Sequence, residues 1–580
     1  MFDVTPDDIS RLNDTDLRDL VGRLCEAELH RHGLSSAAVT YGGHQNAADG
    51  GIDVRVALSA APSNALGDDS FVPRPATGFQ VKAQDMPRAA IEREMRPAGS
   101  VRPVIQALVA EAGAYIIVSS RGSVADGVLR ARRKAMRGAL AEMPDADRIH
   151  VDFYDRKRLA TWVRQHPGVG LWVKERLGSA VRGWRPYGPW SSPAEGTAGL
   201  FLLDEKLRIH LGAKHAPEPV RVVQAIDQLR AWLAQPKGCV RLVGLSGVGK
   251  TRLVQALFEA DIGACPLAPS LAVYTNLSDD PDPQPTEMVT NLIANQKPAV
   301  VIVDNCPADL HRTLSNRCKA PDSTVSVLTI EYDIRDDQPE GTEVVRMDTA
   351  SPELIEQLLE RRYSQLSQID ARTIARFSGG NARMAIALAE TVQRGDSLSG
   401  LSDEDLFQRL FWQRHTPSPD SALLRAAQAC ALVYSFEAET PDGAVADELS
   451  RLASLADQTP GEMYRHISEL LRRDLVQQRG LWRAVLPHAL ANRLAARALE
   501  GIPPKFIRDV LIGQAPDRLA RSFSRRLSYL HDQPKAQAIV RQWLSPGGLL
   551  GDAWMRDDTK WEMFENAAPV LPESALAAIE

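Results

Sequence analysis

Gly244-Leu245-Ser246-Gly247-Val248-Gly249-Lys250-Thr251 reads G-x-x-x-x-G-K-T, the spacing of a phosphate-binding loop. An apolar run at 239–243 predicts a strand before it, and apolar residues at helical spacing over 252–260 predict a helix after it. In this setting backbone N–H groups surround a triphosphate, the lysine reaches the β- and γ-phosphates, and the threonine hydroxyl binds Mg²⁺. We predict a nucleoside triphosphate site formed by Gly244, Ser246, Gly247, Val248, Gly249, Lys250, Thr251 and Arg252.

The composition indicates several globular domains. For 580 residues we expect three or four, and 44% hydrophobic against 24% charged residues allows each an ordinary core. No apolar run approaches the length of a membrane span, and the acidic stretch 1–8 is unlike a signal peptide. The six cysteines are scattered without a C-x-x-C pair, which favours reduced thiols over disulfides or a zinc site. We therefore expect a cytoplasmic protein without a membrane partner.

A second group of polar residues lies in the N-terminal region. The sequence predicts an amphipathic helix over 16–32, a strand that begins near Asp53, and another strand over 78–83 that carries Gln80 and Lys82. Residues two apart on a strand share a face, so a carboxylate, an amide and an ammonium are expected together. Carboxylate and carbonyl oxygens bind Mg²⁺, and a lysine can orient or deprotonate an attacking water. The alternative is a strand pair with polar residues on its solvent face.

The pattern Gly51-Ile52-Asp53 followed by Gln80-Val81-Lys82 resembles the Mrr-like restriction-endonuclease branch of the PD-(D/E)XK nuclease superfamily. The resemblance implies that Asp53 is the principal metal ligand, that Gln80 replaces the usual second acid at the metal, and that Lys82 is the catalytic lysine. The family also draws an acid from the first helix, for which Glu26 is our choice, with Glu28 and Asp19 as alternatives. The implied activity is Mg²⁺-dependent cleavage of double-stranded DNA.

A basic helix is predicted after the core strand 114–120. Five cations fall within eight residues of it, namely Arg130, Arg132, Arg133, Lys134 and Arg137. Such a run is either a solvated face or a set of phosphate contacts beside the proposed nuclease centre.

A second buried strand is predicted at 299–303, and it ends in Asp304-Asn305, the expected Walker B element. Asp304 is expected to hold Mg²⁺ through water. Many vigorous ATPases place an acid where Asn305 stands, and an asparagine cannot act as a base, so slow hydrolysis suited to a switch is our hypothesis. Arg335 follows a third strand, 323–330, and is either a sensor of the γ-phosphate or an ordinary exposed arginine.

The segment Gly379-Gly380-Asn381-Ala382-Arg383 resembles the G-G-N-P-R segment that opens the lid helix of STAND ATPases, with alanine in place of the proline. Helices predicted at 423–433 and 462–472 and a hairpin at 475–483 then match the winged helix that follows the lid in that class. By this resemblance His488 contacts the β-phosphate of ADP in the resting state. The alternative is a histidine that only caps a helix.

The expected fold is an α/β multidomain chain. We assign a nuclease domain to 1–183, a linker to 184–215, a P-loop NTPase domain to 216–346, a helical lid to 347–400, a winged helix to 401–500 and the beginning of a helical sensor to 501–580. This order resembles the bacterial antiviral STAND (Avs-type) proteins. The resemblance implies that a phage protein binds the sensor, that ATP and Mg²⁺ replace ADP, and that a homo-oligomer, expected to be a tetramer, activates the nuclease. One rival is a STAND-type transcription regulator that binds DNA without cutting it. Another is an NTP-driven restriction enzyme that recognises DNA methylation.

Overall fold

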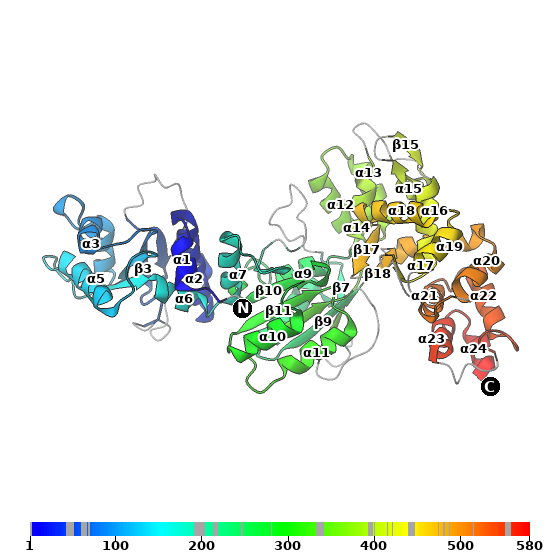
Figure 1. The fold of residues 1–580 in the computed structure, drawn as a ribbon. Coiled ribbons are helices and arrows are strands. Elements are labelled where there is room, and N and C mark those ends of the chain that lie inside the picture. The colour runs from blue at the N-terminus through cyan, green and yellow to red at the C-terminus, as the bar shows by residue number, and fades with distance from the viewer. Residues whose placement is uncertain are drawn as a thin grey trace.

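The structure is a computed structural model, and its parts follow one another along the molecule in chain order (Figure 1). It describes residues 3–41, 51–59, 66–67, 70–188, 190, 204–212, 218–244, 247–279, 281–331, 342–392, 398, 401–413, 416–419, 421–438, 447–473, 475–479, 482–485, 488–513, 515–551 and 558–579.

The N-terminal part is built on a five-stranded sheet. Its strands lie in chain order: β1 (Val39–Tyr41), β2 (Val54–Ala57), β3 (Ala76–Lys82), β4 (Ala114–Ser119) and β5 (His150–Asp155). The first three strands pair antiparallel, and β3, β4 and β5 pair parallel. Every residue of β4 is buried, which explains why the sequence of this strand is hydrophobic up to its last residue, Ser119.

Helices cover both faces of this sheet. One apolar core lies under α1 (Pro6–Arg11), α2 (Asp14–Arg31), α6 (Arg156–Val163) and α7 (Pro167–Arg176). The other lies under α3 (Arg88–Met95), α4 (Pro103–Ala110) and α5 (Asp126–Ala139). Two short 3-10 turns, η1 (Ser36–Ala38) and η2 (Pro97–Gly99), complete this part. The predicted first helix is therefore present, two residues longer at its start, and the part has three layers, α/β/α.

The central part has an eight-stranded sheet. The order is β6 (Trp184–Arg185), β10 (Ala272–Asn276), β11 (Ala299–Asp304), β12 (Val325–Ile330), β9 (Cys239–Gly244), β13 (Glu343–Met347), β7 (Arg208–His210) and β8 (Val220–Arg221). The five strands from β10 to β13 run parallel, so their carboxyl ends meet at one edge. The helices are α8 (Val222–Ala234), α9 (Lys250–Ala256), α10 (Pro285–Ala294) and α11 (Ala308–Cys318), with the 3-10 turns η3 (Pro269–Leu271) and η4 (Leu277–Asp279).

Part of the predicted linker belongs to this second sheet. β6 pairs with β10 at one edge, and β7 pairs with β13 towards the other, so both protect strands that would otherwise be exposed edges. Trp190 stacks on Tyr274 with ring centroids 4.7 Å apart. This aromatic residue of the predicted linker therefore docks on the central part.

Helix α7 joins the first two parts. Trp172 belongs to the core of the N-terminal part, whereas Leu171, next to it, belongs to a core of the central part. A Cβ added to Gly168 would lie 2.9 Å from the carbonyl oxygens of Ser270 and Ala272, so the helix is pressed against η3 and the start of β10.

The C-terminal part is mainly helical, with one continuous core from Ala350 to Ala575. It comprises α12 (Pro352–Arg362), α13 (Gln368–Ser378), α14 (Ala382–Ala389), α15 (Asp403–Arg409), β14 (Trp412–Gln413), β15 (Thr416–Pro419), α16 (Ser421–Ala431), β16 (Phe436–Glu437), α17 (Asp447–Leu455), α18 (Pro460–Arg472), β17 (Val476–Arg479), β18 (Trp482–Val485), α19 (His488–Gly501), α20 (Pro504–Arg508), the π-helix η5 (Asp509–Gly513), α21 (Asp517–Ser528), α22 (Pro534–Leu544), α23 (Asp558–Ala567) and α24 (Pro572–Ile579). The predicted hairpin is β17–β18, and β16 adds a third strand to it. No helix within the described ranges is both long and apolar enough to cross a membrane.

Candidate functional site

The phosphate-binding loop lies where β9 ends and α9 begins, at the edge where the parallel strands end. Gly247 and Gly249 have φ angles of +82° and +100°, a region that glycine enters without steric cost. A Cβ on Gly244 would lie 2.6 Å from the carbonyl oxygen of Met347, so a side chain is excluded there as well. Val248 is buried in the core and anchors the loop, while Ser246 lies outside the described residues.

The polar side chains of this loop meet the end of β11. Thr251 Oγ1 donates to Asp304 Oδ2 at 2.7 Å, and Tyr274 donates its hydroxyl to the same oxygen at 3.2 Å. Burial and the nearby Asp304 carboxylate raise the pKa of Tyr274. Lys250 donates to the carbonyl oxygen of Gly244 at 2.8 Å, an oxygen of its own loop. A hydroxyl beside a carboxylate and a lysine held by the loop fit a nucleotide with Mg²⁺.

The residue after Asp304 is held by two neighbouring elements. Asn305 has a left-handed φ of +60° and donates from Nδ2 to Asn276 Oδ1 at 2.8 Å, at the end of the next strand. Gln477 of β17 reaches Asn305 Oδ1 at 3.5 Å. The position of the usual second acid is therefore occupied by an amide that links the sheet edge to the hairpin. Arg252, in contrast, turns along its own helix to pair with Glu259.

The lid closes directly on the loop. Ala382 donates its backbone N–H to the carbonyl oxygen of Gly247 at 3.1 Å, and Asn381 caps α14 by accepting from Met384 N at 3.1 Å. A Cβ on Gly247 would lie 2.9 Å from the Cβ of Arg383. Arg383 thus starts its side chain beside the phosphate-binding loop, a position that the sequence prediction did not assign. The sequence signal that could have identified it is the arginine at the end of the Gly379–Arg383 motif.

Two predicted nucleotide contacts cannot be placed. Arg335 lies outside the described residues. His488 begins α19, and its side chain lies outside the described part of the chain.

The structure brings together Asp53 and Gln80, two of the predicted nuclease residues. Asp53 Oδ2 accepts from Gln80 Nε2 at 2.8 Å and from the backbone N–H of Val81 at 2.7 Å. On the other oxygen, Oδ1, the guanidinium Nε of Arg18 approaches to 3.4 Å from α2. α2 is held at this end because Asp14 accepts the backbone N–H of Ala83, just past β3, at 2.9 Å.

Lys82 faces the α3 side of the sheet and has a counter-ion there. Its Nζ lies 3.4 Å from Glu94 Oε2, and Arg102 donates to Glu94 Oε1 at 2.9 Å. The sequence prediction included neither Glu94 nor Arg102, nor Arg18 at Asp53. No periodicity pointed to them, because Glu94 and Arg18 lie on helices, and Arg102 directly before one, whose positions are set by packing against the sheet.

Two buried polar atoms of this centre have no hydrogen-bond partner among the described residues. They are Gln80 Oε1 and the hydroxyl oxygen of Tyr115. Burial, followed by the charge of Glu94, raises the pKa of Tyr115. Unpartnered buried polar atoms are uncommon, and they often mark a place where water or an ion binds. The Asp53 carboxylate beside the free amide oxygen of Gln80 is a donor set that suits a hard divalent cation.

Carboxylates alone do not make a metal site here. In the described ranges no three His, Cys, Asp or Glu side chains gather closely enough to hold an ion. A cation at Asp53 would need the Gln80 oxygen and oxygens from backbone, water or substrate.

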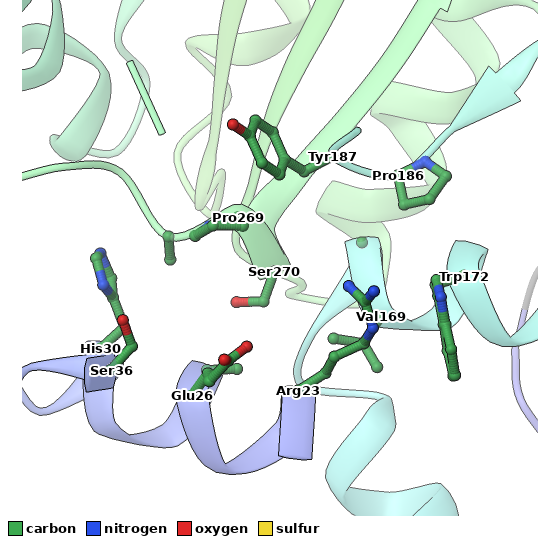
Figure 2. Close-up of a pocket in the computed structure, with 13 residues that line it drawn as sticks. Arg23, Glu26, His30, Ser36, Val169, Trp172, Pro186, Tyr187, Pro269 and Ser270 are labelled. Atoms are coloured by element: carbon green, nitrogen blue, oxygen red, sulfur yellow. The ribbon is translucent and has the colours of Figure 1, made fainter. Parts of the chain in front are cut away.

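Glu26 lies elsewhere. Arg18 faces Asp53, and Glu26 is more than two helical turns further along α2, about 12 Å away along the axis. It is hydrogen-bonded to Tyr41, and burial raises its pKa. Figure 2 shows its carboxyl group directed into a pocket of about 240 Å³ between α2 and η3, opposite Ser270. The structure therefore does not bring Glu26 together with Asp53, because α2 carries it to the joint with the central part.

The two alternatives to Glu26 also differ in place. Glu28 is buried on the other side of α2, where His32 lies 3.4 Å and His166 4.0 Å from its carboxylate. Asp19 contributes to the electrostatic environment of Tyr41.

The basic helix α5 is largely engaged within its own domain. Arg132 is buried and pairs with Asp85 at 2.5 Å, and Arg133 pairs with Asp152 at 2.5 Å. Arg130 pairs with Asp126 along the helix at 2.7 Å. Three of the five cations thus have carboxylate partners, which the count within 130–137 missed because these acids lie outside that stretch.

No protein-family model matches the chain, and no curated protein matches its sequence. Among solved structures, a STAND protein with a tetratricopeptide repeat sensor from Pyrococcus horikoshii is 13% identical, with a TM-score of 0.26, over 65% of this chain and 60% of that one. The RuvB Holliday junction branch migration motor of Thermotoga maritima is 16% identical over 48% of this chain and 93% of that one, with a TM-score of 0.26. The AAA domain of FIGL-1 in complex with ADP is 16% identical over 35% and 82%, with a TM-score of 0.22. Likeness of this degree carries no information on substrate or partner.

Proposed function

We propose that this chain is a nucleotide-controlled DNA endonuclease of the STAND type that acts in antiphage defence. The observation that carries the nuclease half is the hydrogen bond between Asp53 and Gln80, with Lys82 two residues further along the same face of β3 and with no partner among the described residues for the buried Gln80 oxygen. The pattern alone is weak, and its three residues come from two strands with an insertion between them. Their convergence supports a catalytic centre rather than a polar strand face.

Each residue has a distinct task in this proposal. The Asp53 carboxylate and the Gln80 oxygen would hold a divalent cation, which when bound polarises the phosphodiester and favours ionisation of water. Lys82 orients the attacking water or offsets the charge that develops on the phosphate. The backbone N–H of Val81 fixes the Asp53 carboxylate in position.

The central part supplies the switch. Lys250, Thr251 and Asp304 bind ATP or ADP with Mg²⁺, and Asn305 in place of an acid gives slow hydrolysis. The lid contact between Ala382 and Gly247 supports a closed resting state, because the lid covers the loop that must exchange nucleotide. Arg383 is added to the proposed nucleotide contacts, alongside Arg335 and His488.

The C-terminal part supplies control. The unit from α16 to β18 has the element order of a winged helix, and its hairpin touches Asn305 through Gln477. In the proposal a phage protein binds helices after residue 500, ATP replaces ADP, and the chains assemble into a homo-oligomer, expected to be a tetramer. Assembly matters because each nuclease domain offers one active site, while a double-strand break needs two.

The test is a plasmid-cleavage assay with ATP and Mg²⁺, with and without phage-infected lysate. It compares the wild type with Lys82→Ala and Lys250→Ala. The matched controls are Lys157→Ala, an exposed lysine of the same domain, and Lys237→Ala, a half-buried lysine at the opposite end of the central sheet.

Cleavage only with lysate, lost in Lys250→Ala, reduced to a low residual rate in Lys82→Ala and kept in both controls, is the expected result. No cleavage under any condition, with ATP binding intact, would overturn the nuclease proposal and favour a DNA-binding regulator. ATPase activity stimulated by DNA alone would favour an NTP-driven restriction enzyme.

A further inference from the structure

Glu94 forms an ion pair with Lys82 and is itself held by Arg102. Its Oε2 lies 3.4 Å from Lys82 Nζ, and both side chains are largely withdrawn from solvent, with 16% and 26% of their surfaces exposed. A partly buried ion pair of this kind restricts where the flexible lysine can point, because the alternative rotamers lose the counter-ion.

Arg102 holds Glu94 from two sides. Its Nη2 donates to the carboxylate at 2.9 Å, and its Nε donates to the backbone carbonyl of Glu94 at 2.6 Å. The same guanidinium passes over the turn before Asp53, since a Cβ on Gly51 would lie 2.6 Å from Arg102 Cδ. Gly51 has a φ of +95°, which also favours glycine. The anchor of Glu94 is therefore packed against the turn that presents Asp53.

The charge of this centre is unusual for a metal-dependent nuclease. Gln80 supplies an amide where a second acid would stand, and Asp53 is approached by Arg18. Glu94 is then the carboxylate in the described structure that approaches the Lys82 ammonium. Gln80 is neutral at the position of the usual acid, and Glu94 supplies a carboxylate near Lys82 instead.

We propose that Glu94 is a positioning residue for Lys82, anchored by Arg102, and that it holds the lysine side chain directed at the scissile phosphate. This inference rests on the proposed nuclease function. Glu94 acts through Lys82 and is not itself a metal ligand.

The first measurement does not depend on nuclease activity. The full-length wild type and Glu94→Gln are treated with a succinimidyl ester at fixed pH, and acetylation of Lys82 is followed by peptide mass spectrometry. Lys82 should react roughly two- to fivefold faster in the variant, because an ion pair of this exposure restrains the amine by that order. Lys174, paired with Asp8 at 2.9 Å in the same domain, is the internal control and should not change. Glu94→Asp keeps the charge and should react more slowly than Glu94→Gln.

The second measurement is a double-mutant cycle of cleavage with Lys82→Ala, Glu94→Gln and the double variant. Glu94→Gln should slow cleavage severalfold in the wild-type background and have no further effect in the Lys82→Ala background. Mn²⁺ affinity, read by electron paramagnetic resonance, should stay within twofold of wild type.

The outcomes separate the two proposals. Additive effects, an unchanged Lys82 reaction rate, or Mn²⁺ binding weakened as in an Asp53 variant would each overturn the positioning role. Faster Lys82 acetylation in a chain that never cleaves DNA would retain the Glu94–Lys82 pairing and reject the nuclease.

Discussion

The nucleotide loop and the nuclease centre place similar chemistry on two sheets in different ways. At the nucleotide loop, glycines and a lysine–threonine pair within one short stretch meet a single distant acid, Asp304. At the nuclease centre, Asp53 and Lys82 each face an opposite charge supplied by a helix, Arg18 from α2 and Glu94 from α3. The first site is therefore specified locally along the chain, whereas the second depends on how helices pack against the sheet.

The difference also concerns the polar atoms. The hydroxyl of Thr251 and the ammonium of Lys250 are bonded to protein oxygens that a metal ion or phosphate would replace. In the proposed nuclease centre the buried oxygen of Gln80 and the buried hydroxyl of Tyr115 have no hydrogen-bond partner among the described residues. The side chains of Thr251 and Lys250 are thus bonded within the protein, whereas these two groups are not.

The largest effect is expected at the nucleotide loop. Lys250→Ala should weaken binding of a fluorescent ATP analogue with Mg²⁺ about 100-fold, because a charge-assisted contact to phosphate is lost. Equilibrium fluorescence titration of the full chain measures it, with Lys237→Ala as the control. Unchanged affinity would mean that the loop is not the nucleotide site.

A smaller effect is expected at the nuclease centre. Asp53→Asn should weaken Mn²⁺ binding without nucleotide by roughly ten- to fiftyfold, because the one carboxylate next to Gln80 loses its charge. The amide oxygen can still accept the Val81 N–H, so the fold should be kept. Paramagnetic resonance titration reports the affinity, and Asp126→Asn, an exposed acid paired with Arg130, is the control. Equal Mn²⁺ affinity in Asp53→Asn and Asp126→Asn would mean that the metal does not bind at Asp53.

The two regions should also differ in acid stability. Burial, helped by the charge of Arg31, lowers the pKa of His166 to about 4, and Glu28 faces it from α2 at 4.0 Å. Because the unfolded histidine titrates near 6.5, the unfolded state binds the extra proton first. Stability is therefore complete above about pH 6.5 and is lost as the pH falls towards 4.

At pH 5 this loss amounts to about 2 kcal/mol. Calorimetry at pH 7 and pH 5 should show that His166→Gln removes most of the acid-induced drop in Tm of the N-terminal transition. His531→Gln, at an exposed histidine of the C-terminal part, should leave that drop in place. An equal drop in wild type and His166→Gln would assign the acid sensitivity to other groups.

The sequence was informative where chemistry follows from local spacing. The P-loop was predicted from its motif and the strand ending in Asp304 from its apolar run. The grouping of Asp53 with Gln80 was predicted from the D and Q-x-K pattern on two neighbouring strands. Arg18 and Glu94 could not be predicted, because their positions depend on the packing of α2 and α3 against the two faces of the sheet. For the same reason the cations of α5 looked unpaired in sequence, although Asp85 and Asp152 lie beside them in the fold.

A more modest change is expected from Arg18. Replacing it with glutamine removes a guanidinium that lies 3.4 Å from the Asp53 carboxylate and competes with a metal for it. Mn²⁺ should therefore bind about three- to tenfold tighter in Arg18→Gln. A tenfold change in affinity corresponds to about 1.4 kcal/mol of binding free energy. Arg176→Gln, an exposed arginine of α7, is the control. Weaker binding would show that Arg18 supports the site instead of competing for it.

The smallest effect is expected at Glu26. Burial raises the pKa of this carboxyl, so its contribution to folding is greatest when it is protonated and declines as the pH rises through the folded pKa. Glu26→Gln imitates the protonated form and can still bond to Tyr41. Cleavage and Mn²⁺ affinity should remain within about twofold of wild type, since Glu26 lies about 12 Å along α2 from Arg18, the residue of that helix that faces Asp53. Cleavage rates and Mn²⁺ affinities of Glu26→Gln, measured beside those of Asp53→Asn, test this expectation.

If Glu26→Gln were as defective as Asp53→Asn, the first-helix acid predicted from the family resemblance would be catalytic after all, and α2 would have to move between the state described here and the active one. If the variant is unimpaired, α2 serves the nuclease centre through Arg18 at one end and the joint with the central part through Glu26 at the other.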